Sequence, residues 1–150
     1  MKEFLNKNRN LLLLFVLVAA LFVVANTYSN NAPQIISNTP IHWHAHLLIT
    51  IKNEHIVIPA GVGLTRQVEH PDILHTHLED NQIHMEMNPP VYNKQLMLGE
   101  FFKVWGKRFD KSCIFDNCGP TLHFLVNGRV NNGFDKYVMR DGDELEILFE

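Results

Sequence analysis

The sequence predicts an α+β domain over residues 41–150, with a small mixed sheet and one short helix. Residues 41–51 alternate between two kinds of side chain, as a half-buried strand does. Residues 96–105 contain apolar side chains at the spacing of one helix face, at Leu98, Phe101, Phe102 and Trp105. Residues 140–149 read as a polar turn followed by a last strand.

The alternation in residues 41–51 divides this strand into two faces. One face carries His42, His44, His46, Leu48 and Thr50. The other face is apolar and carries Trp43, Ala45, Leu47, Ile49 and Ile51. Residues 52–55 are expected to form a turn, and residues 56–59 to return as a second strand.

A second hairpin is expected from residues 73–78 and 83–87 around the polar loop 79–82. This register places His77 opposite His84 and His75 opposite Glu86. Alternation then gathers His75, His77, His84 and Glu86 on one face. The other face receives the mainly apolar set Leu74, Thr76, Leu78, Ile83, Met85 and Met87. A slip of one residue would mix the two sets, which supports the register.

These histidines predict a transition-metal site. Opposed residues have side-chain bases about 5 Å apart, so two imidazoles can reach one ion at about 2 Å each. Imidazole suits zinc and copper, and we expect one of these two ions. The candidate ligands are His75, His77, His84, His44, His46, His42 and Glu86.

Glu86, the methionines and the remaining histidines each have a separate interpretation. Glu86 can be a ligand, can orient a ligating histidine, or can act as a general base. Met85 and Met87 would suit copper, but the alternation assigns them to the core. His55 and His70 are expected at the surface, and the pattern around His123 assigns it no role.

The rest of the domain supplies a helix, two strands and a cysteine pair. Gly106 is expected to end the helix, and strands are expected over residues 121–126 and 144–149 with a turn at 127–128. Cys113 and Cys118 are the only cysteines, and outside the cytoplasm they would most simply form a disulfide.

In order, these elements are two hairpins, a helix and two strands. Without the second hairpin, this is the strand–strand–helix–strand–strand order of a β-grasp fold. The ending YVMRDGDELEILF also resembles the last turn and strand of ubiquitin-like domains. The sequence therefore predicts a β-grasp-like sheet with an inserted histidine-rich hairpin.

Residues 1–28 read as a targeting segment. Lys2, Lys7 and Arg9 precede an unbroken apolar run over residues 11–25, which indicates that the chain beyond it lies outside the cytoplasm. The run suits a cleaved signal peptide. Extended over residues 10–28, it also suits a single-pass membrane anchor, which needs about 20 residues. Residues 29–40 are polar and are expected to be a flexible linker.

The charge balance argues against a nucleic-acid partner. The chain has 13 basic and 16 acidic residues, and three of the basic and one of the acidic residues lie in residues 1–28. The remainder has 10 basic and 15 acidic residues, a net charge of −5. A domain of this sign lacks the basic surface that nucleic acid requires.

Several stretches together carry a family resemblance: HWHAHLLITI, IPAGVGL, LHTHLEDNQIHMEM, LGEFFKVWG and the LVNG…DGDELEI ending. Over residues 41–150 the chain resembles a family of short, secreted or membrane-anchored archaeal and bacterial proteins with histidine-rich domains. The resemblance implies location and architecture, and supplies no activity.

Together these features predict a membrane-tethered, extracytoplasmic domain that binds copper or zinc for metal binding, delivery or sensing. One alternative is a metal-dependent enzyme with Glu86 as general base. The other is a β-grasp-like module that pairs with another envelope protein and binds no metal. If the signal is cleaved, the domain would be secreted or periplasmic.

Overall fold

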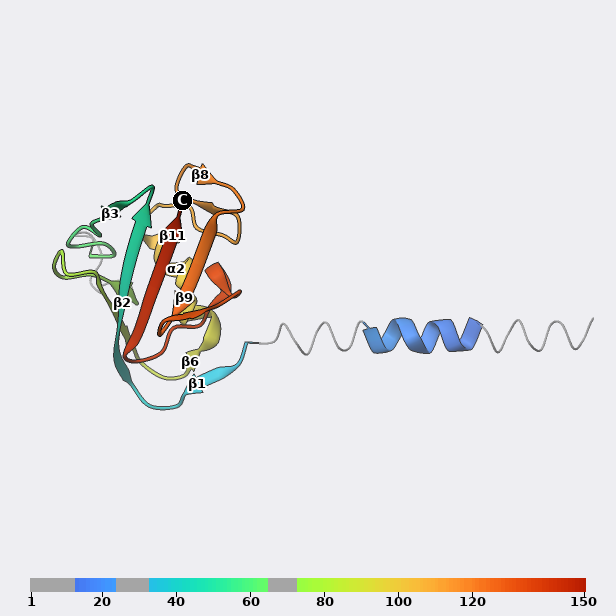
Figure 1. Cartoon of the computed structure of the whole chain (residues 1–150). Helices are drawn as coiled ribbons and strands as arrows, with labels where there is room; N and C mark the ends of the chain where they lie inside the picture. The colour runs from blue at the N-terminus through green and yellow to red at the C-terminus, as the bar shows by residue number, and fades with distance from the viewer. Residues whose placement is uncertain (1–12, 24–32, 65–72) are drawn as a thin grey trace, which may run out of the picture. The chain divides into compact units, whose positions relative to one another are not determined.

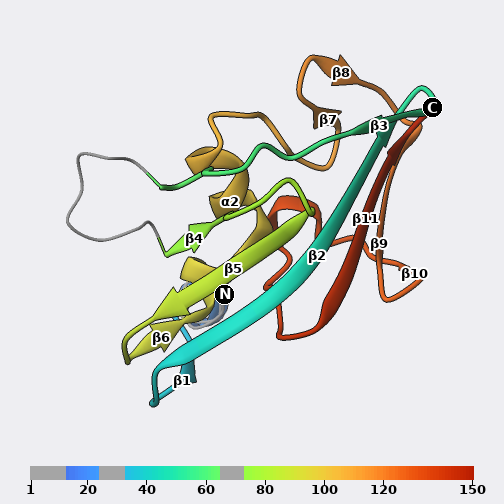
Figure 2. The same cartoon turned by 90° about the vertical axis from the view of Figure 1, so that its left-hand side faces the viewer.

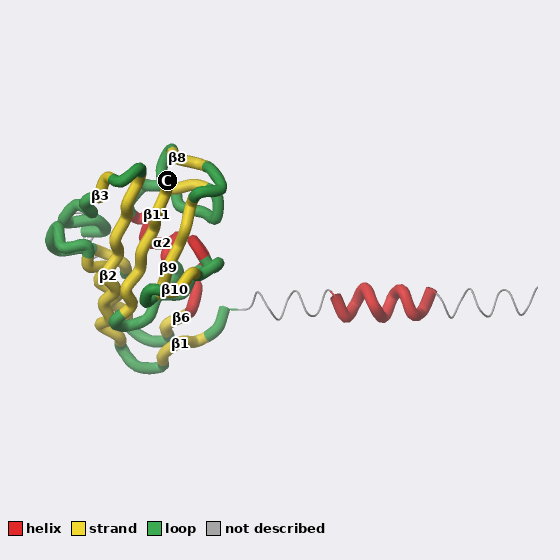
Figure 3. Tube along the Cα trace, viewed as in Figure 1, coloured by secondary structure: helices red, strands yellow, loops and turns green. Residues whose placement is uncertain are grey.

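The computed structural model describes residues 13–23, 33–64 and 73–150. The chain forms two compact units, Met1–Pro33 and Gln34–Glu150. In the first unit, residues 13–23 form a helix (Figure 3). Its side chains are exposed. No helix within the described ranges has both the length and the apolarity needed to cross a bilayer. The expected charged flank and residues 24–32 lie outside the described residues.

The second unit is built on a seven-stranded sheet (Figures 1 and 2). The strand order is β10-β9-β11-β2-β5-β4, and β3 also pairs with β2. The strands span Ile41–Ile51 (β2), Glu54–Ile56 (β3), Leu74–His75 (β4), Gln82–Met87 (β5), Leu122–Val126 (β9), Arg129–Val130 (β10) and Asp143–Phe149 (β11). β2 and β11 are parallel, and the other neighbours are antiparallel. The domain is therefore α+β with a mixed sheet, as the sequence predicts.

The core lies on one face of this sheet, under the helix α2 (Leu98–Val104), which Figure 1 shows behind the strands. The predicted alternation in β2 is confirmed, because Ala45, Leu47, Ile49 and Ile51 are buried. The same alternation buries Leu145, Ile147 and Phe149 of β11. The histidine-bearing face of β2 is thus the face turned away from the core.

The helix is shorter than predicted, but its apolar face is as expected. A 3-10 turn, η1 (Asn93–Leu96), precedes α2, and Leu98, Phe101 and Phe102 are fully or almost fully buried. Gly106 follows the helix with a φ of 68°, and its N–H donates to the Lys103 carbonyl. This left-handed conformation is the one for which glycine is favoured after a helix.

The first hairpin has a shorter turn than the one predicted over residues 52–55. Lys52 and Asn53 have φ values of 50° and 67°, and Ile51 pairs with Glu54. Two positive φ values in a two-residue loop define the tight turn whose twist matches that of the flanking strands. The returning strand therefore covers residues 54–56, whereas the sequence predicted residues 56–59. Ile58 is still fully buried, although it lies beyond the strand.

Within the expected linker 29–40, the structure forms a short strand. β1 (Ile35–Ser37) pairs with β6 (Val91–Tyr92) in a small second sheet. The compact unit accordingly starts at Gln34, ahead of the expected boundary at residue 41. A third small sheet pairs β7 (Cys113–Ile114) with β8 (Asn117–Cys118), and Cys113 and Cys118 form the predicted disulfide.

Near its end the chain follows the prediction closely. β9 and β11 fall within one residue of the predicted strands. Asn127 and Gly128 form the predicted turn, with φ values of 51° and 74°. The short strand β10 after this turn was not predicted, and its two side chains are exposed.

Candidate metal centre

Three neighbouring strands bring the predicted ligands together on one face of the sheet. β5 lies between β2 and β4, as Figure 2 shows. Across β2 and β5, His44 is opposite His84, and across β5 and β4, His84 is opposite His75. These three residues form one row across the strands, with His84 in the middle. His42 and Glu86 are opposite each other in the next row.

The predicted register of the second hairpin is wrong by two residues. His75 is opposite His84 and Leu74 is opposite Met85, whereas the sequence predicted His77 opposite His84 and His75 opposite Glu86. A slip of two residues keeps every side chain on its predicted face. The prediction that His75, His84 and Glu86 share one face is therefore correct, although the predicted register is not.

The register differs because the chain leaves β5 immediately after His75. The Thr76 N–H donates to the Val62 carbonyl and the Thr76 carbonyl accepts from the Gly61 N–H, both at 3.0 Å. The Thr76 hydroxyl donates to the Pro59 carbonyl at 2.7 Å. These bonds replace the predicted pairing with β5, so the loop is longer than four residues. Leu78, predicted in the core, is 64% exposed as a result.

The first set of candidate ligands, called here the four-residue group, comprises His75, His77, His84 and Glu86. Each offers one ligand atom, and these atoms all lie within 4.8 Å of one another. The Nε2 atoms of His75 and His77 are 3.2 Å apart, and His75 Nε2 is 3.8 Å from Glu86 Oε1. Two donors each about 2.0–2.1 Å from a tetrahedral ion are roughly 3.3 Å apart. The spacing of the two imidazoles therefore suits one shared ion.

A second set, the three-residue group, comprises His42, His44 and His84, again with ligand atoms within 4.8 Å. The ring centroids of His44 and His84 are 4.6 Å apart, and those of His42 and His44 are 4.8 Å apart. This group is more open to solvent, because His42 is exposed and the other two rings are half-buried. Glu86 Oε1 lies 3.2 Å from His42 Nε2 and so adjoins both groups.

His84 is the one residue common to both groups. Burial lowers its pKa most, and the neighbouring His44, His77 and His75 lower the pKa further, against an opposite effect of Glu86. A lowered pKa keeps the imidazole neutral, which is the form that binds metal. The His84 Nδ1 atom is buried and has no hydrogen-bond partner among the described residues. A buried unpaired polar atom is costly, and a bond to a cation would remove that cost.

The buried position of His75 depends on the segment that ends at Leu64. Gly63 has a φ of 74°, and a Cβ at this position would lie 2.5 Å from the Leu74 carbonyl oxygen and 3.1 Å from His75 Cβ. The backbone therefore approaches β4 as closely as only glycine permits. His75 is 1% exposed under this cover, which holds its ring in a fixed position.

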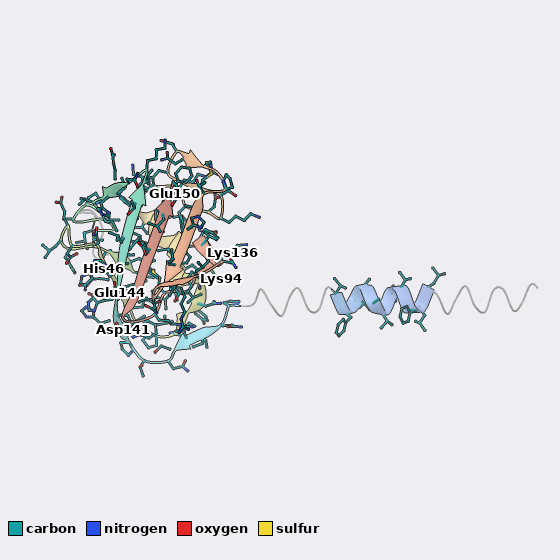
Figure 4. All side chains as sticks on the ribbon, in the orientation of Figure 1. His46, Lys94, Lys136, Asp141, Glu144 and Glu150 are labelled. Carbon is teal, nitrogen blue, oxygen red and sulfur yellow. A yellow bond between two sulfur atoms is a disulfide. The ribbon has the colours of Figure 1, made fainter. Side chains whose placement is uncertain are left out.

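One predicted ligand, His46, does not belong to either group. It faces Gln82 across the sheet, and its Nδ1 lies 3.3 Å from Glu144 Oε2 on β11 (Figure 4). The other six predicted residues are all brought together. The sequence had identified these six, but it gave no sign that β2 pairs directly with β5 or that His84 is central.

Two further histidines and two methionines among the described residues belong to neither group. His55 is exposed and its Nδ1 is 3.0 Å from the Thr50 hydroxyl. His123 is exposed on β9, and His70 lies outside the described residues. Met85 and Met87 are in the core, as predicted.

A depression of about 420 Å³ adjoins the ligands at His42 and Glu86. Asn88 and Gln95 add further polar groups to its wall. A neighbouring hollow of about 380 Å³ shares Gln95 and Ile73 with it and contains Lys94 and Glu100 in its lining. The candidate metal centre thus has space for a small molecule beside it.

The chain matches no family model. No curated protein and no solved structure matches it either.

Proposed function

We propose that the domain binds a transition metal ion, copper or zinc, through the four-residue group His75, His77, His84 and Glu86. The observation that carries the proposal is the convergence of their ligand atoms within 4.8 Å on one face of the sheet. Three imidazoles and one carboxylate make a complete four-coordinate set for such an ion.

The kinds of donor atom in the four-residue group favour a divalent ion over Cu(I). Soft sulfur ligands favour Cu(I). Met85 and Met87 point into the core, and both cysteines are held in the disulfide. The imidazole and carboxylate donors of the four-residue group instead suit Zn(II) or Cu(II).

We infer further that the domain works outside the cytoplasm, held to the membrane by residues 10–28 or released after cleavage. The basic flank and apolar run of the sequence support this location. The Cys113–Cys118 disulfide supports it as well, because such bonds persist in oxidising compartments. The resemblance to short secreted or anchored archaeal and bacterial proteins points the same way.

The fold supports a β-grasp assignment. The first and last long strands, β2 and β11, are parallel neighbours, and α2 lies in the connection between β5 and β9. In this arrangement β5 is the strand that pairs with β2, and β3 and β4 are the inserted part. This differs from the prediction that the whole second hairpin is the insertion.

The exposure of the ligands supports a role in binding, delivery or sensing. His77 is exposed and Glu86 is half-buried, so an ion can enter and leave from solvent, while His75 anchors the site from the buried side. Such a half-open site suits transfer of the ion to another envelope protein.

A second candidate function is metal-dependent hydrolysis with Glu86 as general base. It is favoured by the depression of about 420 Å³ that Glu86 and His42 line. A catalytic metal ion keeps one coordination position open beside such a space, where it activates water. In that case Glu86 would take the proton of the bound water and the three histidines would hold the ion.

The test is metal analysis of the full chain purified without a histidine tag. We expect a transition metal at about one ion or more per chain, or micromolar or tighter binding when zinc or copper is added. His77→Ala should weaken this binding, whereas His123→Ala, at an exposed histidine far from both groups, should not. If no ion is retained or bound, the metal-binding proposal fails, and an interaction module without metal is left.

A further inference from the structure

We propose that this face of the sheet holds two metal ions at once, with His84 as a shared ligand. One ion would lie in the four-residue group and the other in the three-residue group of His42, His44 and His84. The inference rests on the proposed function and extends it from one ion to two.

The position of His84 carries the argument. It lies on the middle strand of the three, directly opposite His44 on one side and His75 on the other. Its ring centroid is 4.6 Å from that of His44 and 5.5 Å from that of His75. The other ligands of the two groups therefore flank the His84 ring, and an imidazole has two nitrogens that can each bind one ion.

The buried Nδ1 atom of His84 gives this arrangement a second, independent support. It has no hydrogen-bond partner among the described residues. In a site for a single ion, one His84 nitrogen binds the metal and the other needs a partner, commonly a carboxylate or a carbonyl. A second cation takes the place of that partner.

Binding of two ions to His84 releases one proton. A neutral imidazole has one lone pair and one N–H, so it binds the first ion without losing a proton. Binding of the second ion at the other nitrogen releases that N–H proton to solvent and leaves an imidazolate between two cations. The negative charge of the imidazolate, together with that of Glu86, offsets part of the repulsion between the two ions.

Enough ligands are present for both ions. Apart from His84, the four-residue group offers His75, His77 and Glu86, and the three-residue group offers His42 and His44. Glu86 Oε1 is 3.2 Å from His42 Nε2 and 3.8 Å from His75 Nε2, so its carboxylate lies between the two positions. The two sites differ in ligand number and exposure, so the four-residue group should bind the tighter ion.

The experiment is a zinc titration of the metal-stripped full chain, followed by calorimetry and by native mass spectrometry. We expect two ions per chain, bound in two steps of different affinity. His44→Ala should bind one zinc ion instead of two, because the weaker binding step is removed. His77→Ala should lack the tighter binding step. His123→Ala should still bind two.

The outcomes separate this inference from the proposal on which it rests. A wild-type chain that saturates at one ion, lost in His77→Ala, overturns the second site and leaves the proposed function standing. No binding at all overturns both. If His44→Ala fails to fold, as judged by circular dichroism, the exposed His42→Ala replaces it, and two ions bound to that variant would also refute the second site.

Copper tests the shared ligand directly. Two Cu(II) ions joined through one imidazolate couple their electron spins, so the second equivalent should reduce the paramagnetic resonance signal of the first. In His44→Ala, one equivalent should give an uncoupled signal. Two uncoupled signals of additive intensity in the wild-type chain would show that His84 does not bridge the ions.

Discussion

His44 and His84 lie directly opposite each other on neighbouring antiparallel strands, with their rings edge to face and their centroids 4.6 Å apart. This contact joins the histidine row of β2 to the ligands of β4 and β5. It also contributes to the low pKa of His84, after the larger effect of burial. The candidate metal centre is thus a property of the whole three-strand face.

Glu86→Gln distinguishes the two candidate roles of Glu86. If Glu86 is a ligand or orients one, loss of its charge should weaken zinc binding roughly 10- to 100-fold. If it is a general base, the variant should retain the ion and lose a hydrolytic activity of the wild-type chain. Calorimetric titration with zinc, beside an activity screen, makes the measurement. Unchanged zinc affinity together with no wild-type activity would contradict both roles.

Gly63→Ala should disturb the metal centre from the side of the covering segment. The new Cβ would meet the Leu74 carbonyl at 2.5 Å, and the positive φ adds backbone strain, which costs on the order of 1–3 kcal/mol. We expect lower stability and weaker zinc binding, because β4 and His75 must move.

Gly61→Ala is the matched control for that variant. Gly61 has a similar φ of 77°, but a Cβ there has no neighbour within 4 Å. It should therefore show only the backbone strain, with zinc binding close to that of the wild type. Urea unfolding and zinc titration of both variants make the comparison, and equal effects of the two would refute the steric explanation.

Asp143→Ala should destabilise the fold at the start of β11, beside His44 of β2. The Asp143 carboxylate is buried at the start of β11, where it accepts bonds from the Tyr137 hydroxyl at 2.8 Å and the Arg140 N–H at 2.7 Å. Burial and the bond to Asp143 raise the pKa of Tyr137. Removing the carboxylate leaves these donors without a partner, at a cost of about 1–3 kcal/mol each.

Urea unfolding of Asp143→Ala, Tyr137→Phe and the double variant measures the coupling. If the hydroxyl–carboxylate bond matters, the double variant should be less destabilised than the sum of the two single variants. Strict additivity would show that the bond contributes nothing.

Asp110 should make the stability of the disulfide loop depend on pH. The Ser112 N–H lowers its pKa most, with further lowering by Arg108 and the Cys113 N–H, against an opposite effect of burial. Because the folded pKa lies below the ordinary value of 3.8, the charged form stabilises the folded state above that value. This stabilisation is lost as the pH falls through the folded pKa.

Asp110→Asn removes this dependence. It should be less stable than the wild type at neutral pH, and the difference in unfolding free energy should shrink at acid pH. Chemical unfolding at several pH values gives both curves. A constant difference between them across the range would contradict a role for the Asp110 charge.

Local patterns in the sequence were sufficient for much of the fold. The alternation in residues 41–51 predicted a strand with His42 and His44 turned away from the core, and the helical spacing of Leu98, Phe101 and Phe102 predicted the buried face of α2. Both patterns are strong because an element that is buried on one side repeats its apolar residues with the period of a helix or of a strand. The same principle assigned His75, His84 and Glu86 to one face despite a register error of two residues.

Which strands are neighbours depended on contacts between distant parts of the chain. Nothing local to residues 41–51 or 82–87 shows that β2 and β5 pair, yet this pairing places His44 against His84. Likewise, the bonds of Thr76 to Val62 and Gly61 ended β4 early and set the true register. A side-chain period is fixed by the residues of one element, whereas pairing and register are chosen by the energy of the whole packed domain. The sequence therefore determined which residues can be ligands, and the tertiary structure decided which of them meet.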